Sequence, residues 1–148
     1  MRALFFFCTP LLLIAQSTVL PVDWEVLPEA VKAAAKKQKA PVDAKVTYVT
    51  VERSPTILLY EMKIAGAKGR DQEILFRPDG TIVETEEAVQ LKDVPAAVRA
   101  AIQKDVGSAQ LLKVDRLTRD GKTLYEGEIV NDGVKRKPLF DSNGKRVE

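Results

Sequence analysis

The second half of the sequence repeats the first half. The segment Leu27–Ala34 (LPEAVKAA) returns as Val94–Ala101 (VPAAVRAA), and Leu75–Glu84 (LFRPDGTIVE) returns as Leu139–Glu148 (LFDSNGKRVE). The order is kept, and the offset changes only from 67 residues at the first segment to 64 at the second. One supersecondary unit has therefore been used twice, and the fold should be built from that unit.

Each repeat is predicted to open with a short helix. Pro28 and Pro95 suit the first helical turn, where a missing N–H removes no hydrogen bond, and breakers end the helices by Pro41 and Gly107. Trp24 precedes the first helix, and we expect it to anchor the N-terminal segment by packing. The two helices share an apolar stripe, which consists of Ala30, Val31, Ala34 and Ala35 in the first repeat and Ala97, Val98, Ala101 and Ile102 in the second.

An antiparallel meander of three or four strands should follow each helix. Alternating, β-branched segments separated by glycine turns, such as Asp120-Gly121, are typical of hairpins. We expect strands at 46–53, 57–64, 72–77 and 81–85, and again at 111–119, 123–130, 134–141 and 145–148. The stretch 84–93 between the repeats is predicted to be an extended crossing strand.

Alternation within the strands sorts the side chains into two faces. The core face, under the helices, should hold Tyr60, Met62 and Ile64, with Thr123, Tyr125 and Ile129 in the second repeat. Phe76 and Phe140 are further core candidates, by their equivalent places in the repeat. In the strand at 46–53, we expect Val49 and Val51 to point inward and Tyr48 and Thr50 outward.

These patterns predict an α+β fold in which two tandem helix-plus-antiparallel-sheet repeats form one curved sheet, with the helices on one face. The predicted organisation is a signal peptide at 1–17, an N-terminal segment at 18–26, repeat 1 at 27–85, a linker at 86–93 and repeat 2 at 94–148. A single repeat of about 60 residues would be marginally stable alone, so the two should share a core.

The first seventeen residues read as an export signal. A basic start, an apolar stretch and the small residues of Ala15-Gln16-Ser17 favour cleavage before Thr18. Cys8 is the one cysteine and lies inside this segment, so the mature chain would have no disulfide and no thiolate. We expect a periplasmic or secreted protein without stable membrane insertion after cleavage.

Composition removes several classes of function. The chain has no histidine, and with a cysteine-free mature form this argues against serine triads, cysteine dyads and ordinary zinc sites. Lysine and arginine number 23 against 21 acidic residues, and the signs alternate, so no nucleic-acid partner is expected. Paired carboxylates such as Glu126 and Glu128 could still support acid–base chemistry. We expect them instead to pair across strands with Lys63, Lys113 and Arg116 on a solvated face.

The repeated motifs resemble a known family. Leu-Pro-x-Ala-Val-x-x-Ala at Leu27, Tyr-Glu at Tyr60 and Tyr125, and Leu-Phe-x-x-(Asp/Asn)-Gly-x-x-Val-Glu at Leu75 and Leu139 are similar to the PepSY-like repeat of the beta-lactamase-inhibitor-like group. The resemblance extends from Leu27 to the end of the chain. It implies an exported, non-catalytic module, with peptidase inhibition or protein binding in some relatives. We expect no cofactor and no metal ion.

The functional hypothesis is therefore a binding module, and not an enzyme, that contacts another envelope or secreted protein through the face of the sheet opposite the helices. Two alternatives stay open: an envelope sensory or structural module that binds a small ligand or polymer, and a carboxylate-based hydrolase. The oligomeric state is left open. The predicted partner-binding residues are Tyr48, Ile57, Leu59, Glu61, Lys63, Leu124, Glu126 and Glu128.

Overall fold

A computed structural model describes residues 18–38, 45–53, 58–65 and 71–147. The predicted signal peptide and Ile57 lie outside these residues, and so do the side chains of 45–53. The described helices are α1 (Glu29–Lys37) and α2 (Ala96–Val106), each preceded by a 3₁₀ turn, at Trp24–Val26 and Leu91–Asp93. The described strands are β1 (Thr18–Pro21), β2 (Lys45–Arg53), β3 (Leu58–Ala65), β4 (Gln72–Phe76), β5 (Ile82–Ala88), β6 (Gln110–Arg119), β7 (Lys122–Asn131), β8 (Val134–Arg136) and β9 (Leu139–Asp141).

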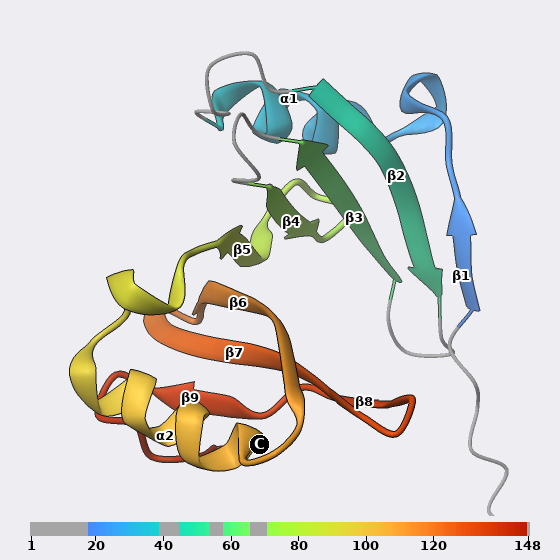
Figure 1. Ribbon diagram of the computed structural model, residues 1–148. Coiled ribbons are helices and arrows are strands. Elements are labelled where there is room, and N and C mark those ends of the chain that lie inside the picture. Colours follow the sequence, from blue (N-terminus) through green and yellow to red (C-terminus); the bar gives the residue numbers. More distant parts are fainter. Residues whose placement is uncertain (1–17, 39–44, 54–57, 66–70, 148) are drawn as a thin grey trace, which may run out of the picture.

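All of these strands belong to one curled antiparallel sheet (Figure 1). Strands β1 to β8 follow one another in sequence order, and β9 pairs with β7 beside β8. Strand β5 pairs with β4 on one side and with β6 on the other, so it joins the two repeats into a continuous sheet. The predicted α+β architecture of two tandem repeats is confirmed.

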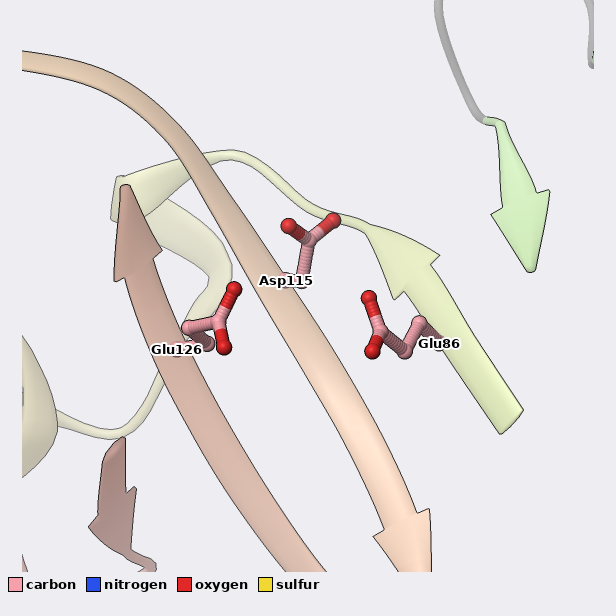
Figure 2. A group of neighbouring side chains, drawn as sticks. All are labelled: Glu86, Asp115 and Glu126. Carbon is pink, nitrogen blue, oxygen red and sulfur yellow. The ribbon is translucent and has the colours of Figure 1, made fainter. Parts of the chain in front are cut away.

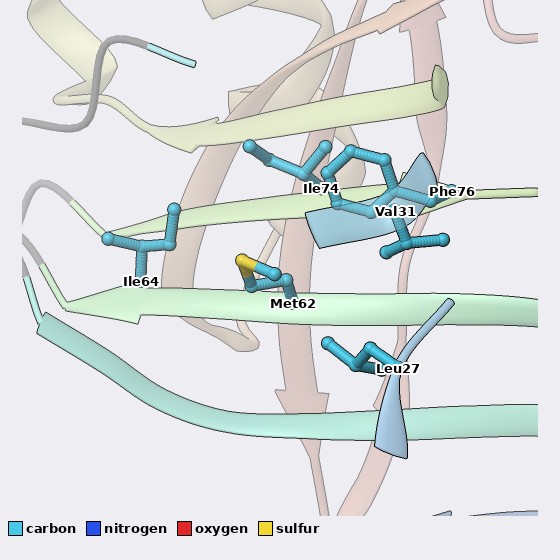
Figure 3. Packing of buried hydrophobic residues seen from close by; sticks show 6 residues of the cluster. All are labelled: Leu27, Val31, Met62, Ile64, Ile74 and Phe76. Atoms are coloured by element: carbon cyan, nitrogen blue, oxygen red, sulfur yellow. The ribbon is translucent and has the colours of Figure 1, made fainter. Parts of the chain in front are cut away.

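The first core lies between α1 and strands β3 and β4 (Figure 3). Val31 and Phe76 are fully buried there, and Met62 is 2% exposed. Trp24 packs against this cluster while half-buried, which confirms its predicted role as a packing anchor. The buried members of the cluster are Leu27, Val31, Met62, Ile64, Ile74 and Phe76.

The second core repeats the first beneath α2. Its buried members are Val94, Val98, Ile102, Val114, Tyr125 and Phe140. The strand register is equivalent in the two repeats, since Tyr60 lies opposite Phe76 and Tyr125 lies opposite Phe140. Phe76 and Phe140 are core residues as predicted, whereas Thr123 is exposed and the prediction that it belongs to the core is wrong.

One glycine in each repeat lies in the turn that packs against the helix, after β4 in repeat 1 and after β9 in repeat 2. Gly80 and Gly144 have φ of +82° and +77°, a conformation that side chains disfavour. A Cβ at Gly80 would lie 2.5 Å from the carbonyl oxygen of Ala30, and a Cβ at Gly144 would lie 2.5 Å from that of Ala97. The close approach of turn and helix therefore requires glycine at the same place in both repeats.

The sequence-based boundaries fail near the ends of the repeats. The strand predicted at 134–141 is two strands, β8 and β9, because Pro138 has no N–H to donate to the sheet. The strand predicted at 145–148 is a single bridge between Phe140 and Arg146. Strand β5 continues to Ala88, and a 3₁₀ turn follows it where an extended segment was expected.

Candidate functional site

The face of the sheet opposite the helices is the candidate site, and we call it the open face. Cross-strand register defines it, because Lys63 lies opposite Glu73, Glu73 opposite Glu86, and Asp115 opposite Glu126. On the described side chains of β3 to β7 it includes Leu59, Glu61, Lys63, Glu73, Leu75, Glu84, Glu86, Lys113, Asp115, Leu117, Arg119, Leu124, Glu126 and Glu128.

The predicted binding residues fall into two separate groups on this face. Half-buried Leu59, Glu61 and Lys63 lie on β3, and half-buried Leu124, Glu126 and Glu128 lie on β7. Strands β4, β5 and β6 separate the two groups. Tyr48 is paired with Lys63 in the register of β2 and β3, but its side chain is outside the described part of the structure, as is the whole of Ile57.

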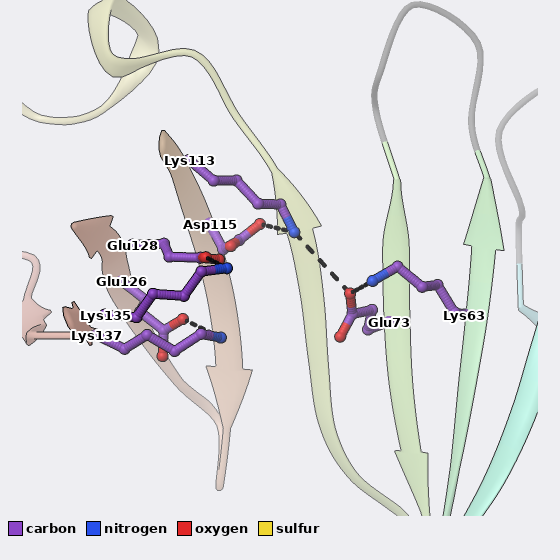
Figure 4. Close-up of polar contacts among 8 residues, drawn as sticks. All are labelled: Lys63, Glu73, Lys113, Asp115, Glu126, Glu128, Lys135 and Lys137. Atoms are coloured by element: carbon purple, nitrogen blue, oxygen red, sulfur yellow. Dashed lines mark hydrogen bonds and ion pairs between the residues drawn. The ribbon is translucent and has the colours of Figure 1, made fainter. Parts of the chain in front are cut away.

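Ion pairs lie between the two groups and beside the second one (Figure 4), and we call these ion-paired residues the charged network. Lys63 pairs with Glu73, and the Lys113 ammonium lies 4.0 Å from Glu73 and 2.9 Å from Asp115. On β7, Glu126 lies 2.9 Å from Lys137, and Glu128 lies 2.7 Å from Lys135.

These contacts correct the predicted ion pairing of Glu126 and Glu128 in part: Lys113 lies opposite Glu128 across β6 and β7 as expected, but the ion pairs of the two glutamates are with Lys137 and Lys135. The lysines of β8 and of the β8–β9 connection lie closer to the two glutamates. Arg116 is on the helix-side face, where it pairs with Glu87.

Three carboxylates from three neighbouring strands converge at the centre of the open face. Figure 2 shows Glu86 of β5, Asp115 of β6 and Glu126 of β7 turned toward one another. One carboxylate oxygen of each lies within 4.8 Å of the others. Asp115 is 1% exposed, because the curled sheet also buries Leu117 and Leu139 beside it. We call Glu86, Asp115 and Glu126 the carboxylate cluster.

The carboxylate cluster perturbs the ionisation of its members. Burial first, and then neighbouring negative charges, raise the pKa of Glu86 to about 7. Those charges belong, in decreasing order of effect, to Glu73, Glu126, Glu84 and Asp115. Burial also raises the pKa of Asp115, although Lys113 opposes that shift.

Ion pairs have the opposite effect at the edge of the network. A hydrogen bond from Lys135 lowers the pKa of Glu128. Burial lowers the pKa of Lys137, but Glu126 more than offsets this effect, so the pKa of Lys137 is raised. The uncompensated negative charge is thus concentrated at Glu86.

The donor set of the carboxylate cluster is of the kind that a hard cation prefers. However, the ammonium groups of Lys113 and Lys137 already lie 2.9 Å from Asp115 and Glu126. A metal ion would have to displace them. Two of the three carboxylates are therefore compensated by the chain itself, and this structure does not support a metal centre.

Cavities adjoin both faces of the central strands. On the open face, a cavity of about 140 Å³ lies beside Glu86. On the other face, a groove of about 480 Å³ lies between the two repeats, with Gln72, Thr85, Thr118 and Tyr125 among its lining residues. Only the second reaches the range of about 300–1,000 Å³ that is usual for small-molecule sites.

Sequence reasoning identified Glu126 but missed Glu73, Glu86, Lys113 and Asp115 as parts of the site. The acidic alternation of Glu84 and Glu86 was visible in the sequence. Glu84 is predicted in the strand at 81–85 and Glu86 in an extended crossing segment, and the structure places both in β5, the strand that joins the repeats. What the sequence did not show is that Glu86 meets Asp115 and Glu126 there. Within the described residues, no helix is long and apolar enough to cross a membrane.

Comparison with known proteins gives a family and a fold. The family described as "putative beta-lactamase-inhibitor-like, PepSY-like" matches twice, at residues 15–83 and 67–146. Among curated proteins, none matches the sequence.

Three solved structures illustrate the likeness in fold. A BLIP-like protein from Bacteroides fragilis NCTC 9343 has 20% identity and a TM-score of 0.60, with 82% of this chain and 84% of that chain covered. A "putative periplasmic" protein from Bacteroides eggerthii DSM 20697 has 20% identity and a TM-score of 0.65, over 82% and 86% of the chains. A DUF2874 family protein from Bacteroides uniformis ATCC 8492 has 19% identity and a TM-score of 0.63, also over 82% and 86%.

Proposed function

The chain belongs to the PepSY-like, beta-lactamase-inhibitor-like family, and from that premise we propose that it is an exported, non-catalytic binding module whose open face contacts another protein of the cell envelope or the extracellular space. The likeness of the family to beta-lactamase inhibitors and the BLIP-like fold support a non-catalytic binding role. A periplasmic location is in keeping with the description of one structural neighbour and with the predicted export signal.

The observation that carries this proposal is the asymmetry of the sheet. Both helices and both apolar cores lie on one side. On the other side, within the described residues, half-buried Leu59, Leu75 and Leu124 alternate with charged groups and no helix packs against them. Apolar side chains among ordered charges are what a polar protein interface presents.

The test compares open-face variants with a matched surface control. Leu59→Gln with Leu124→Gln alters the open face, whereas Leu20→Gln with Val26→Gln alters two apolar residues that are 54% and 68% exposed elsewhere. A partner captured from the envelope fraction is purified, and its Kd is measured for the wild type and for both double variants. Thermal unfolding of each variant confirms that it is folded.

We expect the open-face variant to weaken binding at least tenfold and the control to leave it unchanged. Equal binding by all three proteins would contradict the proposal. If the captured partner is an enzyme, assaying it with and without the module decides whether binding inhibits it.

The helix-side groove favours a second candidate, a module that binds a small ligand or polymer between the repeats. Its volume of about 480 Å³ is in the usual range, and its lining residues Thr85, Thr118 and Thr123 offer hydroxyl groups. Soluble cell-wall glycan fragments should then shift the amide resonances of these threonines and leave those of the open face unchanged. The reverse pattern, or no shift, would remove this candidate.

A carboxylate-based hydrolase is less well supported by the same geometry. The cavity beside Glu86 has a volume of only about 140 Å³, and its lining includes neither Glu126 nor Glu128. A substrate enclosed between two catalytic carboxylates would need a deeper site.

A further inference from the structure

The charged network of the open face is balanced except at one residue. Lysines 63, 113, 135 and 137 are each within ion-pair distance of a carboxylate, and the four carboxylates are those of Glu73, Asp115, Glu126 and Glu128 (Figure 4). Glu86 lies among them, and no lysine or arginine of the described chain is within ion-pair distance of it. It is therefore the one carboxylate of this network that is left uncompensated.

The surroundings of Glu86 are acidic from every neighbouring strand. Glu73 faces it from β4, Glu84 from its own strand β5, Asp115 from β6 and Glu126 from β7. The nearby cations are engaged elsewhere: Arg119 pairs with Glu84, Lys113 with Asp115, and Lys137 with Glu126.

Two buried oxygens of the cluster also lack hydrogen bonds. Oδ1 of Asp115 and Oε1 of Glu126 are buried and accept no hydrogen bond of proper geometry from the described residues. A lysine nitrogen lies 2.9 Å from each, so their charge is compensated but their hydrogen-bonding capacity is not. Neither residue lines the cavity beside Glu86, so a side chain that enters the cavity would meet Glu86 and not these two oxygens.

The cavity beside Glu86 has the volume and lining for one long basic side chain. Its lining consists of Glu61, Glu73, Ile74, Leu75, Glu84 and Glu86. Aliphatic walls suit the methylene stem of lysine or arginine, while carboxylates suit the cationic head. At about 140 Å³ it accommodates a single side chain and not a whole small-molecule ligand.

We propose that the protein partner of the open face inserts a lysine or arginine side chain into this cavity, where its cationic head pairs with Glu86. This inference rests on the proposed function, since it specifies the chemistry of the partner at the same face. A metal ion at Glu86 is the less favourable occupant, because the ammonium groups of Lys113 and Lys137 stand beside the other two carboxylates of the cluster.

The experiment uses a peptide probe in place of the unidentified partner. A library of random 12-residue peptides is selected against the full protein at pH 8, and the tightest binder is synthesised with each lysine or arginine replaced in turn by norleucine or citrulline. The Kd of each peptide is measured for the wild type, Glu86→Gln and Glu87→Gln. The last is a matched control, because Glu87 is the adjacent residue on the opposite face and pairs there with Arg116.

One basic residue of the peptide should dominate. Its replacement, or Glu86→Gln, should weaken binding roughly 10- to 100-fold, as expected for hydrogen bonds to charged groups. The two changes together should weaken it no further, and Glu87→Gln should have no effect. Binding to the wild type should tighten between pH 6 and pH 8, as Glu86 ionises, whereas binding to Glu86→Gln should not change with pH.

The remaining outcomes separate the two proposals. Selected peptides that lack a basic residue, or that bind Glu86→Gln as well as the wild type, overturn this inference. If peptides of either kind bind the Leu59→Gln, Leu124→Gln double variant more weakly than the wild type, the proposed function stands although the inference about Glu86 fails. If they bind the double variant as well as the wild type, the open face is not the binding surface. Calcium chloride is also added to the peptide complexes of the wild type and of Glu86→Gln. If calcium ions displace the peptide from the wild type but not from Glu86→Gln, the cavity is a cation site and the inference is overturned.

Discussion

The two repeats share their backbone contacts but fill their cores differently. In both, a glycine turn meets the helix carbonyl, at Gly80 in the first repeat and Gly144 in the second. In repeat 1 the large Met62 lies on the sheet opposite the small Ala35. In repeat 2 the equivalent strand position is Gly127, and the equivalent helix position is the large Ile102. The close approach of turn and helix requires glycine in both repeats, whereas the large core side chain can come from the sheet or from the helix.

The repeats differ again on the open face. Repeat 2 buries Leu117, Leu139 and Asp115 there, at 1%, 2% and 1% exposure. In repeat 1 the equivalent of Leu139 is Leu75, which is half-buried, and the equivalent of β6 is β2, whose side chains lie outside the described residues. The open face is therefore more buried at Leu139 than at the equivalent Leu75, and Glu86 lies on β5, the strand between the repeats. The two repeats therefore share the contacts that hold helix and sheet together but differ in the surface that they present on the open face.

The largest effect is expected from changing Ile102 and Gly127, the core pair of repeat 2 in which the large residue is on the helix and the small one on the sheet. Ile102→Ala should lower the free energy of unfolding by about 3–4 kcal/mol, since it removes a fully buried side chain. Adding Gly127→Met should restore about half of that loss, because it recreates the arrangement of repeat 1. In the wild-type background, Gly127→Met should be destabilising, since a Cβ there already lies 3.5 Å from Ile102. Urea denaturation of the three variants measures the coupling; additive effects would show that the pair is not exchangeable.

Next in size is the loss of the repeated glycine contact. Gly80→Ala and Gly144→Ala should each cost about 2–3 kcal/mol, from strain at positive φ and from the clash with the helix carbonyl. Gly121→Ala and Gly133→Ala are matched controls, because they also have positive φ but nothing within 4 Å of the new Cβ. They should cost about 1 kcal/mol. Similar losses at all four positions would mean that the turn–helix contact contributes nothing.

A smaller effect concerns pH and the asymmetric face. In the folded state the pKa of Glu86 is raised to about 7 from an ordinary 4.5. The folded protein therefore holds the proton of the Glu86 carboxyl group more tightly than the unfolded chain does. The stability it contributes is present below about pH 4.5 and is lost as pH rises through 7.

At pH 8 the free energy of unfolding of Glu86→Gln should therefore exceed that of the wild type by about 1–2 kcal/mol, a value reduced for solvent screening. The difference should shrink toward pH 5. Urea denaturation at several pH values gives this difference. Glu87→Gln is the control on the opposite face, and a wild-type stability as high at pH 8 as at pH 5, relative to Glu86→Gln, would contradict the account.

The smallest effect comes from a second repeated contact, between the helix and the 3₁₀ turn before it. Nζ of Lys32 donates to the carbonyl of Glu25 at 2.8 Å, and a guanidinium nitrogen of Arg99 donates to that of Lys92 at 3.0 Å. Lys32→Met and Arg99→Met should each lower the melting temperature slightly, by the equivalent of about 0.5 kcal/mol, because these contacts are exposed. If only one of the two variants has a lower melting temperature, the two contacts have the same geometry but do not contribute equally to stability.

Local signals in the sequence were sufficient for the helices and the hairpins. Pro28, Pro95 and the apolar stripes predicted α1 and α2, and the repeat itself predicted the equivalence of Tyr60 with Tyr125 and of Phe76 with Phe140. Pro138 was a visible reason to divide the strand at 134–141, since proline cannot donate to a sheet.

The site depended on non-local register, and the sequence could not supply it. Glu86, Asp115 and Glu126 meet because β5 pairs with β6 and β6 with β7 at one register, and a shift of a single residue would move their side chains to the other face. Which lysines compensate which carboxylates depends further on the curl of the sheet, which brings Lys137 and Lys135 over β7.

The account depends on Glu86 being an uncompensated carboxylate on the open face, and its titration tests this directly. The carboxyl carbon resonance of Glu86, assigned by comparison with Glu86→Gln, is followed by NMR from pH 3 to pH 10 in the free protein. We predict a midpoint near pH 7, which should fall when the selected basic peptide is bound. A midpoint near 4.5 in the free protein would show that Glu86 is already solvated or paired, and would contradict the account.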